Sequence, residues 1–201
     1  MTVTVLCDLR PHPDRVDRVL RRSIEQLSLP SQGVTGRRFA RLFQHVDDPT
    51  WLLYLAEWSS RETFEAYRQS APMPGTPDEF QSLPVCRYFQ RLALFERALV
   101  PVSVMYVDIA SGPAVTHAAR RDRALAYLRS PVRTVPGLSL VQIHEAVTDT
   151  PALAILTGWD TASPAVREER GQEQALLDAF GAHGGTVERF IGRKIVETTV
   201  I

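Results

Sequence analysis

Hydrophobic and polar residues follow an order of strand and helix patterns in the first half of the chain. Residues 3–9 alternate apolar and polar side chains, as in a strand with one buried face. Apolar residues recur at helical spacing over residues 16–27, with a proline and an aspartate shortly before them, where helices begin. Residues 37–45 and 51–58 read as two further strands, on either side of an Asp-Asp-Pro turn. Residues 85–95 predict a closing strand.

A second helix is expected directly after residue 58. The run Ser59-Ser60-Arg61-Glu62 offers a capping box, in which Ser59 bonds the amide of Glu62 and Glu62 bonds back. The helix that follows carries Phe64 and Tyr67. With this helix, the first half has the order βαββαβ of a ferredoxin-like unit.

The second half of the chain repeats the first at a constant offset of 101 residues. The matched positions are Val34 and Val135, Gly36 and Gly137, Val46 and Val147, Asp48 and Asp149, Leu52 and Leu153, Leu55 and Leu156, Trp58 and Trp159, Phe89 and Phe190, and Glu96 and Glu197. This periodicity predicts a duplicated unit, with one copy in residues 1–98 and the other in residues 99–201. In the second copy, residues 165–180 predict one continuous helix, where the first copy has a proline-rich segment.

A ferredoxin-like unit places both helices on one face of its sheet and leaves the other face bare. An exposed apolar face of that size drives association, and the second copy supplies a partner for it. Residues 97–101 are too apolar and too short for a flexible linker. We therefore expect an α+β fold in which two tandem ferredoxin-like βαββαβ units form one intrachain dimeric α+β barrel. Such a chain would be a monomer, as a pseudo-dimer, or a homodimer.

The charge balance and the apolar runs limit the partners and the location. Lys+Arg and Asp+Glu both total 23, so the formal net charge is zero, which argues against a nucleic-acid or anionic-membrane partner. The N-terminus lacks the basic start and the cleavage site of a signal peptide. No apolar stretch approaches the ~18 residues of a membrane span. These features predict a soluble, cytoplasmic protein.

The two cysteines predict no metal site. Cys7 and Cys86 each lie in an apolar run, and neither stands at metal-ligand spacing from another cysteine or a histidine. We expect both to be buried, reduced thiols in strands. No phosphate-binding loop, dinucleotide fingerprint or Ser-His-Asp order is present either.

The segment from residue 36 to residue 67 resembles the antibiotic biosynthesis monooxygenase family. The resemblance rests on a Gly before the second strand, the Asp-Asp-Pro hairpin and the run LLYLAEWSSRETFEAY at residues 52–67. The second half keeps the Gly and Trp159 but loses most of the helix pattern. The resemblance implies a dimeric α+β barrel. It also implies an enzyme that oxidises polycyclic aromatic polyketides to quinones with dioxygen, without a metal or a bound flavin.

Family members contact their substrate through a strand Trp, a strand Asn, a helix Tyr and an Arg. Trp58 matches the strand Trp, and Tyr67 or Phe64 lies where the helix aromatic would be. The Asn has no counterpart, because this sequence contains no asparagine; Tyr54 stands four residues before Trp58, on the same strand face.

The candidate site residues follow from these positions and from side-chain chemistry. Each also has a structural reading, as a core aromatic or a solvated surface charge. The candidates for catalysis are Trp58, Tyr54, Tyr67 and His45, and those for substrate binding are Phe64, Arg38, Arg87, Trp159 and His144. The first half is richer in aromatic residues than the second, so we expect it to hold the site.

Four functions remain open from the sequence. The first is a cofactor-free oxygenase whose partners are a flat aromatic phenol and dioxygen. The second is an oxygenase that receives reduced flavin, FADH2 or FMNH2, from a separate reductase. The third is a non-redox cyclase or isomerase, and the fourth is a binding protein with degenerate sites. Haem degradation is disfavoured, because the second helix of the first half has no histidine to ligate iron.

Overall fold

The computed structural model describes most of the chain. The described residues are 1–28, 35–71, 74–97, 101–113, 116–128, 136–148, 150–160 and 186–199. The strands are β1 (Val3–Pro11), β2 (Arg37–His45), β3 (Leu52–Trp58), β4 (Phe80–Glu96), β5 (Val104–Ser111), β6 (Leu138–Ala146), β7 (Ala152–Trp159) and β8 (Thr186–Thr199). The helices are α1 (Val16–Ser28), α2 (Arg61–Ser70) and α3 (His117–Tyr127), with short 3-10 turns at Pro13–Arg15 and Pro77–Glu79. The predicted strand–helix order of the first half is confirmed, and β4 begins five residues earlier than expected.

Two compact units divide the chain. The first unit comprises Met1–Phe89 and Gly192–Ile201, and the second comprises Gln90–Ile191. Two long strands, β4 and β8, run from one unit into the other. The predicted boundary between residues 98 and 99 remains a prediction, because residues 98–100 lie outside the described part.

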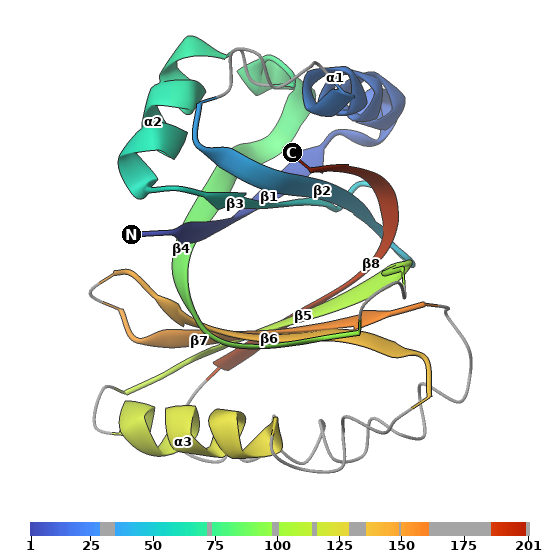
Figure 1. The fold of residues 1–201 in the computed structure, drawn as a ribbon. Helices are drawn as coiled ribbons and strands as arrows, with labels where there is room; N and C mark the ends of the chain where they lie inside the picture. The colour runs from blue at the N-terminus through green and yellow to red at the C-terminus, as the bar shows by residue number, and fades with distance from the viewer. Residues whose placement is uncertain are drawn as a thin grey trace. The chain divides into compact units, whose positions relative to one another are not determined.

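The first unit is an antiparallel sheet in the strand order β4-β1-β3-β2-β8. Helices α1 and α2 both cover one face of this sheet, as Figure 1 shows. Successive side chains of a strand point to opposite faces of the sheet. Every second residue therefore points to the helices, and the apolar residues at these positions pack in one core. That core includes Val5 and Leu9 of β1, Val19 of α1 and Phe64 of α2.

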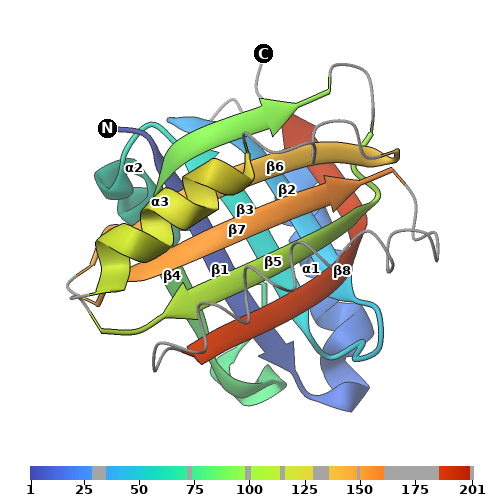
Figure 2. The ribbon, with the colours of Figure 1, turned by 90° about the horizontal axis from the view of Figure 1, so that it is seen from below.

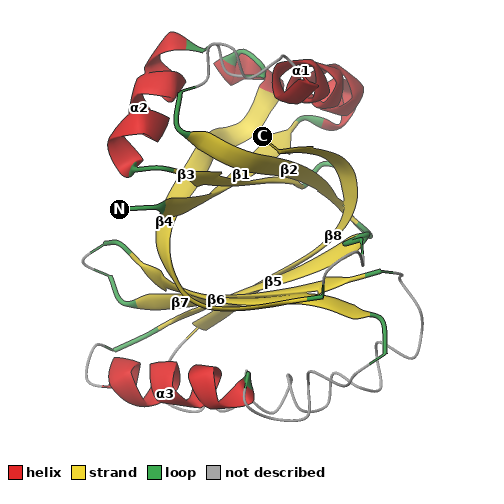
Figure 3. Cartoon of the chain, in the orientation of Figure 1, coloured by secondary structure: helices red, strands yellow, loops and turns green. Residues whose placement is uncertain are grey.

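The second unit has the strand order β8-β5-β7-β6-β4, with α3 lying over β6 and β7 (Figure 2). Figure 3 shows the same elements coloured by type. Its core joins Val141 and Ile143 of β6 to Leu153 and Ile155 of β7 and to Ala124 of α3. The predicted helix over residues 165–180 lies outside the described residues. Among the described residues, no helix is long and apolar enough to cross a membrane.

The same local geometry occurs at matching positions of the two units. Gly36 and Gly137 both have a positive φ, at 91° and 78°. The carbonyl of each accepts a backbone hydrogen bond from the residue after a tryptophan, Ser59 in one unit and Asp160 in the other. Glycine is needed there because other residues rarely adopt that conformation. Gly36 and Gly137, which the sequence repeat matched, therefore form the same kind of turn in the two units.

The N-terminus of α2 differs from the prediction by one residue. The capping box is formed by Ser60 and Thr63, not by Ser59 and Glu62. The Ser60 hydroxyl accepts from the Thr63 amide at 3.3 Å, and the Thr63 hydroxyl accepts from the Ser60 amide at 3.2 Å. A threonine hydroxyl can replace the usual glutamate at this position, and the sequence pattern did not reveal that choice.

The expectation of reduced cysteines is wrong. Cys7 and Cys86 form a disulfide that joins β1 to β4. The two residues are direct cross-strand neighbours in the antiparallel pairing, which brings their Cα atoms to 4.0 Å. A sequence separation of 79 residues hid this proximity. The reduced thiols that supported a cytoplasmic location are therefore absent.

The disulfide should contribute measurably to stability. It closes a long loop, so its reduction should lower the free energy of unfolding by about 4 kcal/mol through the entropy gained by the unfolded chain. Urea unfolding of the protein with and without a dithiol reductant measures this difference. The double variant Cys7→Ala/Cys86→Ala should show the lower stability and no response to reductant. Equal midpoints for the oxidised and reduced protein would contradict the cross-link.

Candidate active site

A cavity in the first unit has its floor on one row of neighbouring strand residues. Leu42 of β2 pairs with Tyr54 of β3, Tyr54 with Cys7 of β1, and Cys7 with Cys86 of β4. All four line the cavity. Because residues directly opposite in a sheet project to the same face, the register of the sheet alone brings them together.

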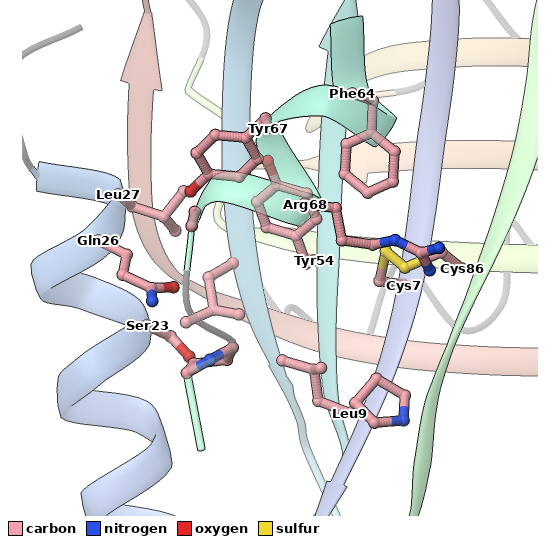
Figure 4. A pocket seen from close by; sticks show the side chains of 14 residues that line it. Cys7, Leu9, Ser23, Gln26, Leu27, Tyr54, Phe64, Tyr67, Arg68 and Cys86 are labelled. Atoms are coloured by element: carbon pink, nitrogen blue, oxygen red, sulfur yellow. A yellow bond between two sulfur atoms is a disulfide. The ribbon is translucent and has the colours of Figure 1, made fainter. Parts of the chain in front are cut away.

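Helices α1 and α2 form the other wall of the cavity. Ser23, Gln26 and Leu27 project from α1, and Phe64 and Tyr67 project from α2 (Figure 4). The enclosed volume is about 130 Å³. A cavity near that size holds one aromatic ring. Exposed Arg68 also lines the cavity, which places an opening to solvent beside α2.

Beyond Tyr54, the next row of the sheet is built from small residues. Ala40 and Ala56 face each other there and are fully buried. Trp58 follows on the same face and is also fully buried. Its ring centroid lies 5.0 Å from that of Tyr67 and 5.5 Å from that of Phe64. The expected shared face of Tyr54 and Trp58 is confirmed, since both belong to the core beneath the helices.

Arg37 lies at the Trp58 end of the site, and the sequence pattern did not identify it as a site residue. Simple alternation from Ala40 and Leu42 places Arg38 toward the helices. The pairing of β2 with β3 is interrupted by a register shift between Arg37 and Phe39, so that Arg37 stands opposite Trp58. Such bulges redirect side chains. Arg37 is only 3% exposed. A Gly-Arg-Arg sequence at the start of a strand was the one available signal.

Four buried polar atoms near Trp58 lack a hydrogen-bond partner among the described residues. They are the Tyr54 hydroxyl, the Trp58 indole nitrogen, and Nε and Nη1 of Arg37. Burial raises the pKa of Tyr54, and nearby Tyr67 raises it further, while Arg37 and Trp58 oppose the rise. Burial also raises the pKa of Tyr67, again opposed by Arg37. Arg37 is therefore close to both hydroxyls and within weak hydrogen-bonding reach of Tyr54.

The protonation of the two tyrosines limits what they can do. With raised pKa values, both remain neutral phenols at neutral pH and act as hydrogen-bond donors or acids rather than bases. Of the described residues that line the cavity, none is a carboxylate or a histidine. The site thus presents donors and cationic groups to a ligand. It suits a ligand atom that carries negative charge.

His45 lies at the far end of β2, away from the cavity lining. Its ring stacks on Trp51 with centroids 4.9 Å apart, and its Nδ1 accepts from the amides of Asp47 and Asp48 at 3.2 and 3.1 Å. Burial lowers the pKa of His45, and Asp47 partly opposes this. In this structure His45 organises the β2–β3 turn.

Neither arginine expected to bind substrate lines the cavity. The Arg38 side chain is 57% exposed and pairs with Glu57 at 3.4 Å. Arg87 lies next to Cys86 on β4, so it projects to the opposite face of the sheet, where it approaches Asp8 at 3.6 Å. A role for either in binding stays a prediction.

The second unit has a different set of residues at the matching positions. Trp159 is buried in its core. Ile155 stands where Tyr54 stands in the first unit, and Leu138 pairs with Trp159 as Arg37 pairs with Trp58. His144 lies on β6, is buried, and contacts Gln142 at 3.1 Å. No counterpart of the Arg37 and Tyr54 pair occurs among the described residues of this unit.

Residues 2–81 match the family model for antibiotic biosynthesis monooxygenases. This match confirms the resemblance in the segment that contains the cavity. No curated protein matches the sequence significantly.

Several solved structures share the fold over nearly the whole chain. An anthrone oxidase-like protein aligns with a TM-score of 0.73 and 13% identity, covering 98% of this chain and 93% of that chain. A monooxygenase-like protein from Listeria innocua has a TM-score of 0.61 and 11% identity, with 96% and 94% covered. A haem-degrading enzyme from Listeria monocytogenes has a TM-score of 0.53 and 10% identity, with 96% and 99% covered. At these identities the likeness shows the fold alone.

His144 should make the protein less stable in mild acid. Burial, with a contribution from Arg91, lowers the pKa of His144 to about 3. A histidine in an unfolded chain has a pKa near 6.5, so below that pH His144 is protonated in the unfolded chain and stays neutral in the folded chain. This group alone should lower the free energy of unfolding by about 1.4 kcal/mol per pH unit as the pH falls from about 6.5 toward 4.

Denaturant unfolding at several pH values tests this expectation. His144→Gln should flatten the pH dependence by that amount. His12→Gln, at an exposed position, should keep the wild-type dependence. Parallel pH profiles for the wild type and His144→Gln would show that His144 is protonated in the folded protein.

Proposed function

We propose, on the premise that residues 2–81 form an antibiotic biosynthesis monooxygenase domain, that this chain is an oxygenase for a flat phenolic substrate of the aromatic polyketide type. The observation that carries the proposal is the cavity of the first unit. It is walled by the rings of Tyr54, Phe64 and Tyr67, and the unpartnered donors of Trp58 and Arg37 lie beside it.

The cavity matches the chemistry of such a substrate. A phenol or anthrone that loses a proton gives a delocalised anion, which passes electrons to dioxygen. One oxygen atom then becomes the new ring carbonyl, and the other leaves as water with the two hydrogens of the oxidised CH2 group. The substrate supplies all the electrons, so this version needs no metal and no resident cofactor.

Residues in and beside the cavity have distinct roles in this proposal. Phe64 forms an aromatic wall for a flat ring, and Trp58 packs against Phe64 outside the lining. Tyr54 and Tyr67 donate hydrogen bonds to the oxygen that gains negative charge. The enclosed space accommodates one ring, so further rings of a larger substrate would extend through the opening beside Arg68.

We infer that the first unit carries this site. The second unit replaces Tyr54 by Ile155 and Arg37 by Leu138, which removes both the phenol and the guanidinium. The repeated glycine turn and the repeated strand register support a tandem pair of ferredoxin-like units in which one copy has kept the chemistry.

The flavin-dependent version is the second candidate. The asparagine of the family has no counterpart in this sequence, and among the described residues that line the cavity none is a carboxylate or a histidine. A substrate that resists ionisation in such a site would need electrons from reduced flavin, FADH2 or FMNH2, delivered by a separate reductase. The two versions differ in one measurable requirement, the addition of reduced flavin.

Oxygen consumption with a panel of anthrones and hydroxylated polycyclic aromatics tests the proposal. We expect uptake without flavin, reduced about tenfold or more in Trp58→Phe, because the substitution removes the indole donor and part of the ring wall. Trp159→Phe makes the same change in the second unit and should keep the wild-type rate. Product analysis should show a quinone with one oxygen atom from dioxygen.

The other outcomes distinguish the alternatives. Uptake only with enzymatically reduced flavin would support the flavin-dependent version. Equal losses in Trp58→Phe and Trp159→Phe would contradict the assignment to the first unit. If substrates bind but no oxygen is consumed either with or without reduced flavin, the oxygenase proposal is contradicted. That result would favour a cyclase, an isomerase or a binding protein of the same fold.

A further inference from the structure

We propose that Arg37 is an anion-binding residue, and that the cavity takes an aromatic ligand whose conjugated oxyanion reaches its guanidinium at the inner end. Arg37 does not itself line the cavity but lies beside Tyr54 and Tyr67, which do. The inference rests on the proposed function for the choice of site, and it adds the charge state of the ligand and the residue that selects it. Three observations support it.

The first observation is that Arg37 is a buried charge without a counter-ion. The buried carboxylates have counter-ions: Glu57 pairs with Arg38, Glu79 with Arg18 and Arg22, and Asp108 with Arg189. Buried Arg120 donates to the carbonyl of Pro113, and its Nε also lacks a partner among the described residues. Arg37 has no ion pair among the described residues, and its Nε and Nη1 are buried without a hydrogen-bond partner there, although Arg37 lies within weak hydrogen-bonding reach of Tyr54. An uncompensated buried charge is costly, so a bound anion would recover the lost solvation.

The second observation is that the neighbouring polar groups are all donors. The Tyr54 hydroxyl and the Trp58 indole N–H are also buried without partners. Both tyrosines near Arg37 hold their protons at neutral pH, since burial raises the pKa of each. A neutral ligand carbonyl satisfies such donors weakly, whereas an oxyanion accepts charge-assisted hydrogen bonds from them.

The third observation is that most of the remaining lining is apolar, with Ser23, Gln26 and Arg68 as its other polar side chains. Leu9, Leu42 and Phe64 line it, together with the sulfur atoms of the Cys7–Cys86 disulfide. The body of the ligand must therefore be apolar and flat, with its charge at one end. A phenolate, an enolate and an aromatic carboxylate share this description, and the experiment separates them.

Arg37 would affect how the substrate becomes ionised. No carboxylate or histidine lines the cavity among its described residues, so a protein base is not required by this arrangement. Arg37 would stabilise the phenolate relative to the phenol and thereby lower the pKa of the bound substrate, and the proton would leave to water. This assigns Arg37 a specificity role that its neighbour Arg38, exposed and paired, does not share.

Binding of matched naphthalene probes tests the proposal without turnover. 1-Naphthoate and 1-naphthamide have the same shape and differ in charge, and calorimetry gives the dissociation constant of each. We expect the wild type to prefer the naphthoate. Arg37→Gln should weaken naphthoate binding roughly tenfold or more and change naphthamide binding by less than about threefold, because only the charge-assisted contact is lost. Arg37→Lys should recover part of the affinity.

The control variant removes a positive charge outside the cavity. Arg15→Gln lies at the start of α1, where Arg15 pairs with Asp14 at 3.0 Å, and it should bind both probes as the wild type does. An equal loss of both probes in Arg37→Gln would show that Arg37 only supports the fold, and it would overturn the proposal. So would a wild type that binds the two probes equally or binds neither.

A second measurement needs no variant. The absorbance of 1-naphthol reports its ionisation, so a pH titration of the bound probe gives its pKa. The wild type should lower this pKa relative to free naphthol, and an unchanged or raised value would overturn the proposal for phenolates. A naphthoate preference with no effect on naphthol would restrict the ligand to carboxylates.

These results are separable from the test of the oxygenase. If the protein binds naphthoate through Arg37 but consumes no oxygen, the proposed anion site stands and the proposed oxygenase reaction is contradicted. Oxygen uptake that is unaffected by Arg37→Gln would retain the reaction and overturn the role of Arg37.

Discussion

The register of β3 between β1 and β2 determines which side chains face the helices of the first unit. It aligns Leu42, Tyr54, Cys7 and Cys86 in one row and sets Trp58 against Arg37 at the end of the same face. A slip of one residue would turn Tyr54 and Trp58 away from the helices and bring Glu57 beneath them. The glycine turn at Gly36, the cap at Ser60 and the cross-strand disulfide all act on strands of this row or on the helix above it.

The same register concentrates donors at one end of this face. Alanines at positions 40 and 56 lie between Tyr54 and Trp58, and the Tyr54 hydroxyl, the Trp58 indole and the Arg37 guanidinium all carry buried atoms without a partner among the described residues. A folded protein normally pairs buried polar groups, as Glu79 and Asp108 do with arginines. The group of unpartnered donors beside the cavity is the basis for the proposed anion site. In the second unit, Ile155 and Leu138 fill the equivalent positions with apolar side chains, as expected where no ligand is bound.

Much of the fold was predictable because its causes are local or periodic. The alternation over residues 3–9 and the helical spacing over residues 16–27 predicted β1 and α1, and the repeat offset paired Trp58 with Trp159. The site was less predictable because its key contacts depend on tertiary pairing. The Cys7–Cys86 bond joins residues far apart in sequence. The inward position of Arg37 depends on a bulge in β2. Simple alternation ignores this bulge and assigns the inward position to the neighbouring Arg38.

A crystal structure of the protein with bound 1-naphthoate tests the central claim most directly. The account predicts the naphthalene ring between Tyr54 and Phe64, with the carboxylate within hydrogen-bonding distance of the Arg37 guanidinium and the Trp58 indole nitrogen. A probe bound elsewhere, or bound with its carboxylate directed to solvent beside Arg68 while Arg37 stays unpaired, would contradict the account.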